Sequence, residues 1–202
     1  MQYWCKQAQR GFCKTGLDMR VIGLFGLIGS GKDTVSDYIE KKYGYNVIIM
    51  GDIVRELAAQ RGLEPNRDNL ALTQREQAQK YGLKWFGEEV VRRIRAKGWQ
   101  KVVINGTRRP EDAAIPKKAF GKDYILIQVD ADPKIRFERM KSRARIGDPK
   151  TLEEFLHQEE LDKKAFDFET LKKFIDYTVT NNGTREELYK QVDALLKKTG
   201  FS

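Results

Sequence analysis

Residues 26–32 read Gly-Leu-Ile-Gly-Ser-Gly-Lys, and Asp33 and Thr34 follow directly. The preceding stretch, residues 20–25 (RVIGLF), has the apolar run of a short buried strand, whereas residues 33–43 have the apolar spacing of a helix. Glycines at such a junction let the backbone bend, so that successive N–H groups point at phosphate oxygens beside the positive end of the helix. The stretch therefore predicts a phosphate-binding loop, and a glycine-rich structural turn is the less favoured alternative.

This loop is expected to hold ATP together with Mg²⁺. The lysine of such a loop reaches the β and γ phosphates as a mobile point charge, which also makes it a catalytic candidate. The next position normally carries Ser or Thr, whose hydroxyl binds Mg²⁺, but here it is an aspartate. A carboxylate is a hard oxygen ligand, so Asp33 is the candidate metal ligand; alternatively it only favours the first helical turn. The residues expected to bind the nucleotide are Gly26, Leu27, Ile28, Gly29, Ser30, Gly31, Lys32, Asp33 and Thr34.

Further apolar stretches alternate with helical patterns along the rest of the chain. Strands are predicted at 20–25, 45–50, 101–105, 124–129 and 174–180, and helices at 33–43, 51–60, 67–81, 84–97, 110–119, 133–143, 151–164 and 184–198. This alternation predicts an α/β fold, a three-layer α/β/α P-loop NTPase with a five-stranded parallel sheet.

Two helical insertions are expected on the ligand side of this sheet. One lies at about residues 51–98 and would bind the acceptor, and the other lies at about 143–166 and would form a lid. Residues 1–18 lack a clear amphipathic period and are expected to be a disordered extension before a single domain of residues 19–202. Met19 is a candidate start of translation.

Two polar motifs follow predicted strands, where ligands of parallel sheets bind. They are residues 51–55 (GDIVR) and residues 105–110 (NGTRRP), and both are expected on loops. Adjacent arginines there suit an acceptor phosphate, while Asp52 could orient or deprotonate the acceptor. The alternative for each arginine is a solvated surface. The residues expected to contact the acceptor are Asp52, Arg55, Arg108 and Arg109.

An arginine-rich stretch follows the fourth strand. Arg136, Arg139 and Arg143 are spaced i, i+3 and i+7, which places them on one face of a helix, and Arg145 lies in the loop beyond. Cationic side chains on a mobile segment could close over a triphosphate, so Arg143 and Arg145 join Lys32 and Asp52 as catalytic candidates. A solvated basic helix is an equally weighted alternative.

The amino-acid composition favours some kinds of ligand and excludes some kinds of metal or disulfide site. The 202 residues carry a formal charge of +9, which favours phosphate-bearing partners; small nucleotides are expected, with nucleic acid less favoured. Both cysteines, Cys5 and Cys13, lie in the first 18 residues, which excludes a disulfide framework or Cys-based zinc site in the body. His157 is the only histidine, so a His-based metal site is excluded too. With no apolar run of about 20 residues and no signal peptide, no membrane partner is expected and a cytoplasmic protein is predicted.

Together, GLIGSGKDT, GDIVR, INGTRR and the arginine-rich segment resemble the P-loop nucleoside monophosphate kinase superfamily, over about residues 20–198. In the adenylate kinases of that superfamily an arginine after strand two binds the acceptor phosphate, and Arg55 matches it; Arg109 matches the arginine after strand three. The GKD and TRR triplets look more like deoxynucleoside monophosphate kinases and phosphomevalonate kinases. The late NNGTREEL resembles the C-terminal region of dephospho-coenzyme A kinases. The overall run most resembles archaeal-type P-loop proteins of unassigned substrate.

One position departs from the superfamily pattern. Those families usually carry Asp at the end of strand three, where it holds the magnesium shell, whereas this chain has Asn105. Asp33 or Asp52 could compensate, or the protein could act as a nucleotide-binding switch. The resemblance implies ATP-dependent transfer of the γ-phosphoryl group to a nucleoside or deoxynucleoside monophosphate. The alternatives are a dephospho-coenzyme A kinase and an NTPase or regulator associated with nucleic acid.

Overall fold

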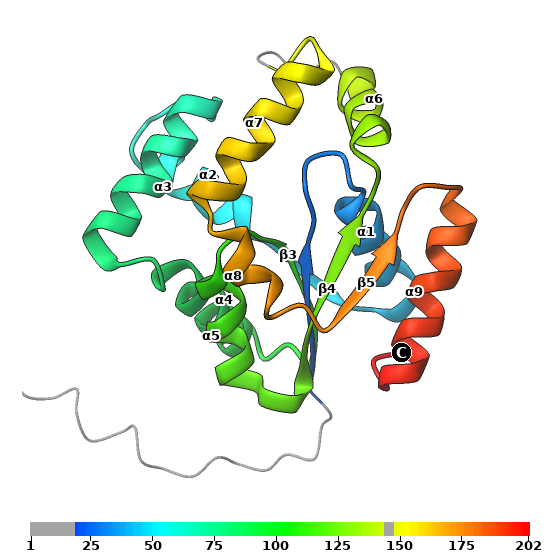
Figure 1. Cartoon of the computed structure of the whole chain (residues 1–202). Coiled ribbons are helices and arrows are strands. Elements are labelled where there is room, and N and C mark those ends of the chain that lie inside the picture. Colours follow the sequence, from blue (N-terminus) through cyan, green and yellow to red (C-terminus); the bar gives the residue numbers. More distant parts are fainter. Residues whose placement is uncertain (1–18, 144–147) are drawn as a thin grey trace, which may run out of the picture.

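The computed structural model describes residues 19–143 and 148–202; the predictions for residues 1–18 and Arg145 fall outside the described residues. A parallel sheet forms the middle layer, with five strands in the order β2-β3-β1-β4-β5 (Figure 1). The strands are β1 (Arg20–Phe25), β2 (Asn46–Ile49), β3 (Lys101–Thr107), β4 (Tyr124–Asp130) and β5 (Tyr177–Thr180). The predicted α/β class and parallel five-stranded sheet are confirmed.

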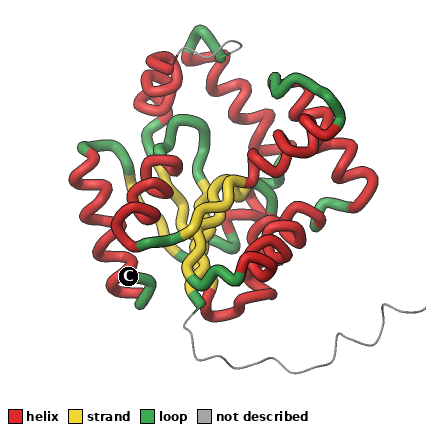
Figure 2. The backbone as a smooth tube through the Cα atoms, turned by 180° about the vertical axis from the view of Figure 1, so that it is seen from behind, coloured by secondary structure: helices red, strands yellow, loops and turns green. Residues whose placement is uncertain are grey.

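Helices cover both faces of the sheet, as Figure 2 shows from behind. The helices are α1 (Lys32–Tyr43), α2 (Met50–Gln60), α3 (Arg67–Tyr81), α4 (Trp85–Lys97), α5 (Pro110–Phe120), η1 (Gly121–Asp123), α6 (Pro133–Arg143), α7 (Leu152–Ala165), α8 (Phe168–Lys172) and α9 (Arg185–Thr199). Buried side chains of α2, α4, α5 and α8 pack on one face, and those of α1 and α9 on the other. The layers are therefore α/β/α.

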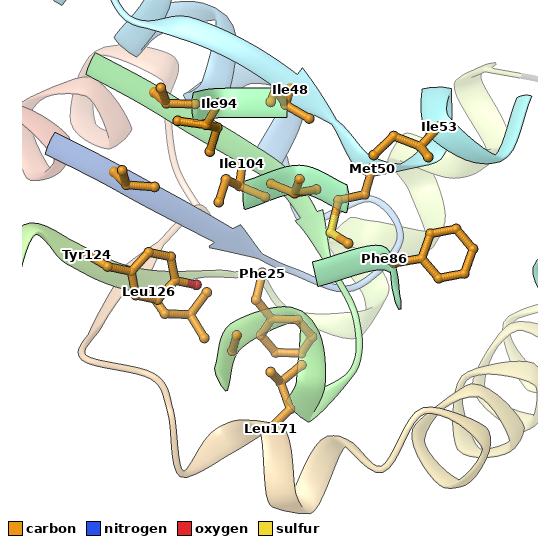
Figure 3. Packing of buried hydrophobic residues seen from close by; sticks show 14 of the residues in the cluster. Phe25, Ile48, Met50, Ile53, Phe86, Ile94, Ile104, Tyr124, Leu126 and Leu171 are labelled. Carbon is orange, nitrogen blue, oxygen red and sulfur yellow. The ribbon is translucent and has the colours of Figure 1, made fainter. Parts of the chain in front are cut away.

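The central strand shows why its sequence is apolar throughout. Val21 and Phe25 belong to the core on the α4 side, whereas Ile22 and Leu24 belong to the core on the α1 side. Figure 3 shows Phe25 packed among the side chains of the first of these cores. A parallel strand covered on both faces buries every side chain, so it reads as a continuous apolar run rather than an alternating one. This burial fixes the end of β1, where the phosphate loop begins.

Most predicted boundaries agree with the structure to within one residue, and the strands show the differences that matter for the site and the core. The second strand ends at Ile49, because Met50 is buried in the core as the first residue of α2 and leaves no loop between strand and helix. The third strand continues past Asn105 to Thr107 with a shift in register against β1. The fifth strand begins only at Tyr177.

The short helix α8 was missed by the sequence analysis. Phe168 and Leu171, three residues apart, are buried in the α4-side core. Phe174 and Ile175 pack partly buried against the same core, so their apolar character comes from packing rather than from a strand. A helix of five residues is too short for its apolar period to be recognised.

Helices α6 and α7 overlap the lid expected at about residues 143–166 and are called the lid helices from here on. They share a small apolar cluster of Phe137, Met140 and Phe155. The prediction that Arg136 lies with Arg139 and Arg143 on a cationic face was wrong. Arg136 is 2% exposed, pairs with the carboxylate of Glu159 on α7, and donates from Nε to the Ala131 carbonyl oxygen at 2.9 Å. Its role in the structure is to join the two lid helices.

We expect Arg136→Met to lower the free energy of unfolding by about 3 kcal/mol, because it leaves the Glu159 carboxylate buried without its guanidinium partner. The double variant Arg136→Met/Glu159→Leu removes both charges and should recover part of this loss. Urea denaturation measures both effects. Arg92→Met is the control and should cost less than about 1 kcal/mol, because Arg92 is exposed and its partner Glu89 keeps its second ion pair with Arg93. Equal losses for the Arg136 and Arg92 variants would contradict the assignment.

Candidate phosphate-binding site

The phosphate loop connects the end of β1 to the start of α1. Gly29 and Gly31 have φ values of 81° and 94°, a conformation that favours glycine, and Ser30 N donates to the Leu27 carbonyl oxygen at 3.0 Å. A Cβ at residue 29 would stand 2.5 Å from the Arg136 carbonyl oxygen. The helix begins at Lys32 with no side-chain cap at Gly31, so the N–H groups of its first turn are available to an anion.

The carbonyl groups of the loop face backwards onto side chains. The carbonyl oxygens of residues 28, 29 and 30 accept hydrogen bonds from Arg136 Nη1 (3.5 Å), Arg139 Nη1 (3.4 Å) and Asn181 Nδ2 (2.8 Å), respectively. Arg139 Nη2 also donates to Asn181 Oδ1 at 3.3 Å. Because the carbonyls are satisfied from behind, the N–H groups can remain directed at a ligand. The sequence analysis missed Asn181; the only sequence signal was the Asn-Asn-Gly that follows β5.

Asp33 lies between a lysine and a buried amide. Its Oδ1 is 3.4 Å from Lys32 Nζ and accepts a hydrogen bond from Asn105 Nδ2 at 3.0 Å. Partial burial acts to raise the pKa of Asp33, but the Lys32 charge and the Asn105 bond prevail and leave this pKa below its usual value. Burial lowers the pKa of Lys32, against the opposing effect of Asp33. The carboxylate is therefore ionised at neutral pH.

These groups fit a Mg²⁺ ion that arrives with a nucleotide. The Asp33 side chain is 65% exposed, and its hard oxygens lie beside the phosphate loop. Asn105 is 3% exposed, and its Oδ1 has no hydrogen-bond partner among the described residues. Within residues 19–143 and 148–202, no group of three or more His, Cys, Asp or Glu side chains could hold a metal by itself. Mg²⁺ commonly binds through one or two carboxylates together with phosphates and water, and Asp33 can supply such a carboxylate.

Two arginines approach the loop lysine from different elements. Arg108 lies in the β3–α5 loop and Arg143 at the end of α6, and the positive charge of each acts to lower the pKa of Lys32. Arg143 also lowers the pKa of Asp33. Lys32 and Asp33 are therefore in contact, and Arg108 and Arg143 lie near enough for their charges to act on Lys32.

The other predicted acceptor residues are arranged differently. Asp52 and Arg55 lie in α2 and not on a loop, so that part of the prediction was wrong, and their half-exposed side chains form an ion pair with each other. Arg109 Nη1 donates to the Ala165 carbonyl oxygen at 3.2 Å, and its guanidinium carbon lies 4.9 Å from the centre of the Phe166 ring. These arginines would have to exchange partners to bind an acceptor phosphate.

A buried carboxylate positions the β3–α5 loop. Asp112 Oδ2 accepts hydrogen bonds from the backbone N–H groups of Arg108 and Arg109 at 3.1 and 2.9 Å. Burial raises the pKa of Asp112 to about 6, although these two bonds act in the opposite sense. Asp112 thus holds the backbone from which Arg108 extends.

The raised pKa of Asp112 predicts a specific pH dependence. The folded protein binds this proton more tightly than the unfolded chain, whose aspartate has a pKa near 3.8, so stability falls as pH rises from about 4 to 7. We expect Asp112→Asn to remove roughly 2–3 kcal/mol of that fall, measured as the difference between urea-denaturation curves at pH 4 and 7. Glu138→Gln on the exposed face of α6 is the control and should leave the pH dependence unchanged. An unaltered slope in Asp112→Asn would contradict the assignment.

Residues of the phosphate loop, α7 and α8 line a pocket. Figure 1 shows where α7 and α8 lie in the fold. One wall consists of apolar side chains, including Phe25, Leu27, Phe166 and Phe168. Charged side chains complete the lining, namely Arg67, Arg108, Asp148, Glu159 and Asp162. Since Gly26 and Ile28 also line it, the pocket adjoins the expected position of the transferred phosphate.

Comparisons with known sequences show the family to which this chain belongs. A family model described as an AAA domain matches residues 25–156. The UPF0200 protein of Thermococcus kodakarensis is 36% identical over 181 residues, which cover 87% of this chain and 96% of that protein. The chain belongs to the UPF0200 family. The UPF0200 protein of Hyperthermus butylicus is 34% identical, with 91% of this chain and 97% of that protein covered. For the UPF0200/UPF0201 protein of Archaeoglobus fulgidus, also 34% identical, 90% of this chain but 56% of the relative is covered, so this chain spans about half of that protein.

Solved structures show the same fold at low sequence identity. Shikimate kinase from Bacteroides thetaiotaomicron aligns with a TM-score of 0.60 and 16% identity, covering 89% of this chain and 98% of that one. Shikimate kinase from Acinetobacter baumannii in complex with shikimate aligns with a TM-score of 0.55 and 15% identity, covering 90% and 96%. This UPF0200 chain thus has a P-loop kinase-like fold. Among the described residues, no helix has the length and apolarity needed to span a bilayer.

Proposed function

We propose that this UPF0200 protein is an ATP-dependent phosphotransferase that moves the γ-phosphoryl group to a small phosphorylated acceptor, a nucleoside or deoxynucleoside monophosphate, in the cytoplasm. The observation that carries the proposal is the meeting of Lys32, Arg108 and Arg143 at the phosphate loop, beside a pocket that adjoins that loop. A protein that only binds a nucleotide has no need for a second pocket beside its phosphate loop.

In the proposed reaction an acceptor oxygen forms a bond to the γ phosphorus while the bond to the β–γ bridging oxygen breaks, and ADP leaves with that electron pair. A phosphate acceptor attacks in its ionised form, so no proton needs to be moved. The N–H groups of the loop and Lys32 compensate the charge of the β and γ phosphates, and Arg143 from the end of α6 and Arg108 from the β3–α5 loop flank the transferred group. Arg145 is a further candidate lid cation.

Mg²⁺, when bound, would neutralise charge on the β and γ oxygens. Asp33 is the residue that would hold it, directly or through water, and Asn105 keeps the Asp33 carboxylate in place through the 3.0 Å hydrogen bond. The Asp33 carboxylate is exposed and forms an ion pair with Lys32. This arrangement is compatible with direct binding of Mg²⁺ and with binding through water.

Among the arginines proposed to bind the acceptor, Arg108 needs the least rearrangement. Its guanidinium makes no hydrogen bond or ion pair with the part of the chain that the structure describes, and it lies over the Phe166 ring at 5.6 Å. Arg55 would have to leave Asp52, and Arg109 would have to leave Ala165. We therefore assign the acceptor phosphate first to Arg108, with Arg55 and Arg109 joining when their present partners are released.

Two other functions remain as outcomes of the same test. A dephospho-coenzyme A kinase would phosphorylate a hydroxyl and would need Asp52 as a base after its release from Arg55. A regulator or NTPase associated with nucleic acid is favoured by the net charge of +9 and by the amide of Asn105.

The first experiment is an acceptor screen. Purified protein with Mg²⁺ and ATP is mixed separately with each nucleoside and deoxynucleoside monophosphate and with dephospho-coenzyme A, and ADP formation is followed. We expect one acceptor to stimulate turnover and Lys32→Met to lower that rate at least about 100-fold, because the charge on the transferred phosphate loses its cation. Lys41→Met, at the exposed far end of α1, is the control and should retain full activity. Turnover that is independent of every acceptor but stimulated by RNA or DNA would favour the regulator.

Asp33→Ala tests the proposed metal position. We expect the variant to need at least about tenfold more Mg²⁺ for half-maximal turnover, because the nucleotide-bound ion loses its protein carboxylate. The measurement is ADP formation against Mg²⁺ concentration at fixed ATP. Glu40→Ala, on the exposed side of the same helix, is the control. An unchanged Mg²⁺ requirement in Asp33→Ala would show that Asp33 acts only on the helix.

A further inference from the structure

The pocket in front of the phosphate loop has an aromatic wall. Phe166 and Phe168 are stacked with ring centres 6.0 Å apart and an interplanar angle of 15°, and Phe25 meets Phe168 edge to face at 5.3 Å. Phe155 of α7 and Leu27 of the loop extend the same lining. Because these rings pack on one another, the wall is rigid and apolar. Phe25, Phe155 and Phe168 are nearly buried, and the guanidiniums of Arg108 and Arg109 lie over the partly exposed Phe166 ring. Sugar hydroxyls placed against it would lose their hydrogen bonds to water without replacement.

The polar side of the pocket carries two carboxylates, Asp148 and Asp162, that have no hydrogen bond or ion pair among the described residues, and Asp162 is the one that the charge of Arg108 reaches. Asp162 of α7 is half buried, and its side chain makes no hydrogen bond or ion pair within the described ranges, whereas Glu159, one turn earlier, is paired with Arg136 and with Lys163. Burial raises the pKa of Asp162, and the charges of Arg108 and Arg67 act in the opposite sense. A free carboxylate would repel the phosphate of an acceptor, so its use must lie with another part of that molecule.

Arg108 connects the two halves of the site. Arg108 and Asp162 line the same pocket as Gly26 and Ile28 of the phosphate loop, and the charge of Arg108 reaches both Lys32 and Asp162. An acceptor with its phosphate at Arg108 therefore has its remaining part between the aromatic wall and Asp162.

We propose that this pocket binds the base of the acceptor: a planar nitrogen heterocycle that lies against the phenylalanine wall and donates a ring or exocyclic N–H to Asp162, with its phosphate at Arg108. Asp162 is then a specificity-determining residue that selects acceptors with a hydrogen-bond donor on the ring. The assignment of the bound molecule as the phosphoryl acceptor rests on the proposed function, but the binding preference does not.

Binding without ATP tests the preference directly. Calorimetric titrations with AMP, CMP, GMP and UMP are compared with 1-naphthyl phosphate, which has a flat ring but no ring donor, and with ribose 5-phosphate, which has neither. We expect at least one nucleotide to bind tenfold or more tightly than ribose 5-phosphate, with 1-naphthyl phosphate between them.

Variants then separate the two parts of the pocket. Asp162→Asn should weaken the preferred nucleotide about tenfold and change 1-naphthyl phosphate less than about twofold, since only the nucleotide loses a charge-assisted hydrogen bond. Asp162→Glu keeps the carboxylate and should recover part of the affinity. Glu153→Gln, on the exposed side of α7, is the matched control and should bind like the unaltered protein. Thermal unfolding of each variant shows that the fold is retained.

Two results would overturn the inference. One is equal affinity for ribose 5-phosphate and for all four nucleotides, since the ring would then lie outside the pocket. The other is a nucleotide preference that Asp162→Asn leaves unchanged. A protein that binds a nucleotide in this way, yet shows no acceptor-stimulated ADP formation, would retain the inference and refute the proposed phosphoryl transfer.

Discussion

The carbonyl groups on the back of the phosphate loop set the constraint on which the site depends. A glycine-rich turn can direct its N–H groups at a phosphate only if the carbonyls on its other side are satisfied. Here Arg136, Arg139 and Asn181 provide those hydrogen bonds from α6 and from the turn after β5. Since the buried Arg136 also pairs with Glu159 on α7, the position of the lid is linked to the conformation of the loop.

The residue after the loop lysine and the residue on the neighbouring strand have exchanged their usual charges around the expected metal. The total charge of the two side chains is the same as in the usual arrangement. A P-loop NTPase of the usual kind has a neutral hydroxyl after the lysine and a carboxylate on the neighbouring strand. This protein has the carboxylate after the lysine, at Asp33, and a neutral amide on the strand, at Asn105. The exchange suits the burial of the two positions, because the buried place holds the amide and the exposed place holds the charge. Burying an amide that makes a hydrogen bond costs far less than burying a carboxylate.

Several charged side chains on the proposed acceptor side of the site already bind other groups of the protein. Asp52 and Arg55 hold each other, and Arg109 contacts the end of α7 and stacks near Phe166. Arg108 and Asp162 keep their polar groups available beside an aromatic wall, within the described part of the chain. The likeness to shikimate kinases shows the fold alone, and the side chains that line this pocket are what determines which molecule fits it.

The sequence by itself determined the phosphate loop, the alternation of strands and helices and the parallel sheet, because each of these follows from local patterns of glycine and apolar residues. It also predicted Lys32, Asp33, Arg108 and Arg143 as site residues from their places relative to strand ends and helix turns, and the assignment of their roles stays a prediction. Only the tertiary structure decided that Arg136 is buried, that α8 exists and that Asn181 supports the loop. Asn181 and Ser30 are 151 positions apart, and no local pattern reports a hydrogen bond between such distant residues. The pocket at Asp162 could not be predicted from the sequence for the same reason, since its lining comes from segments that only folding brings together.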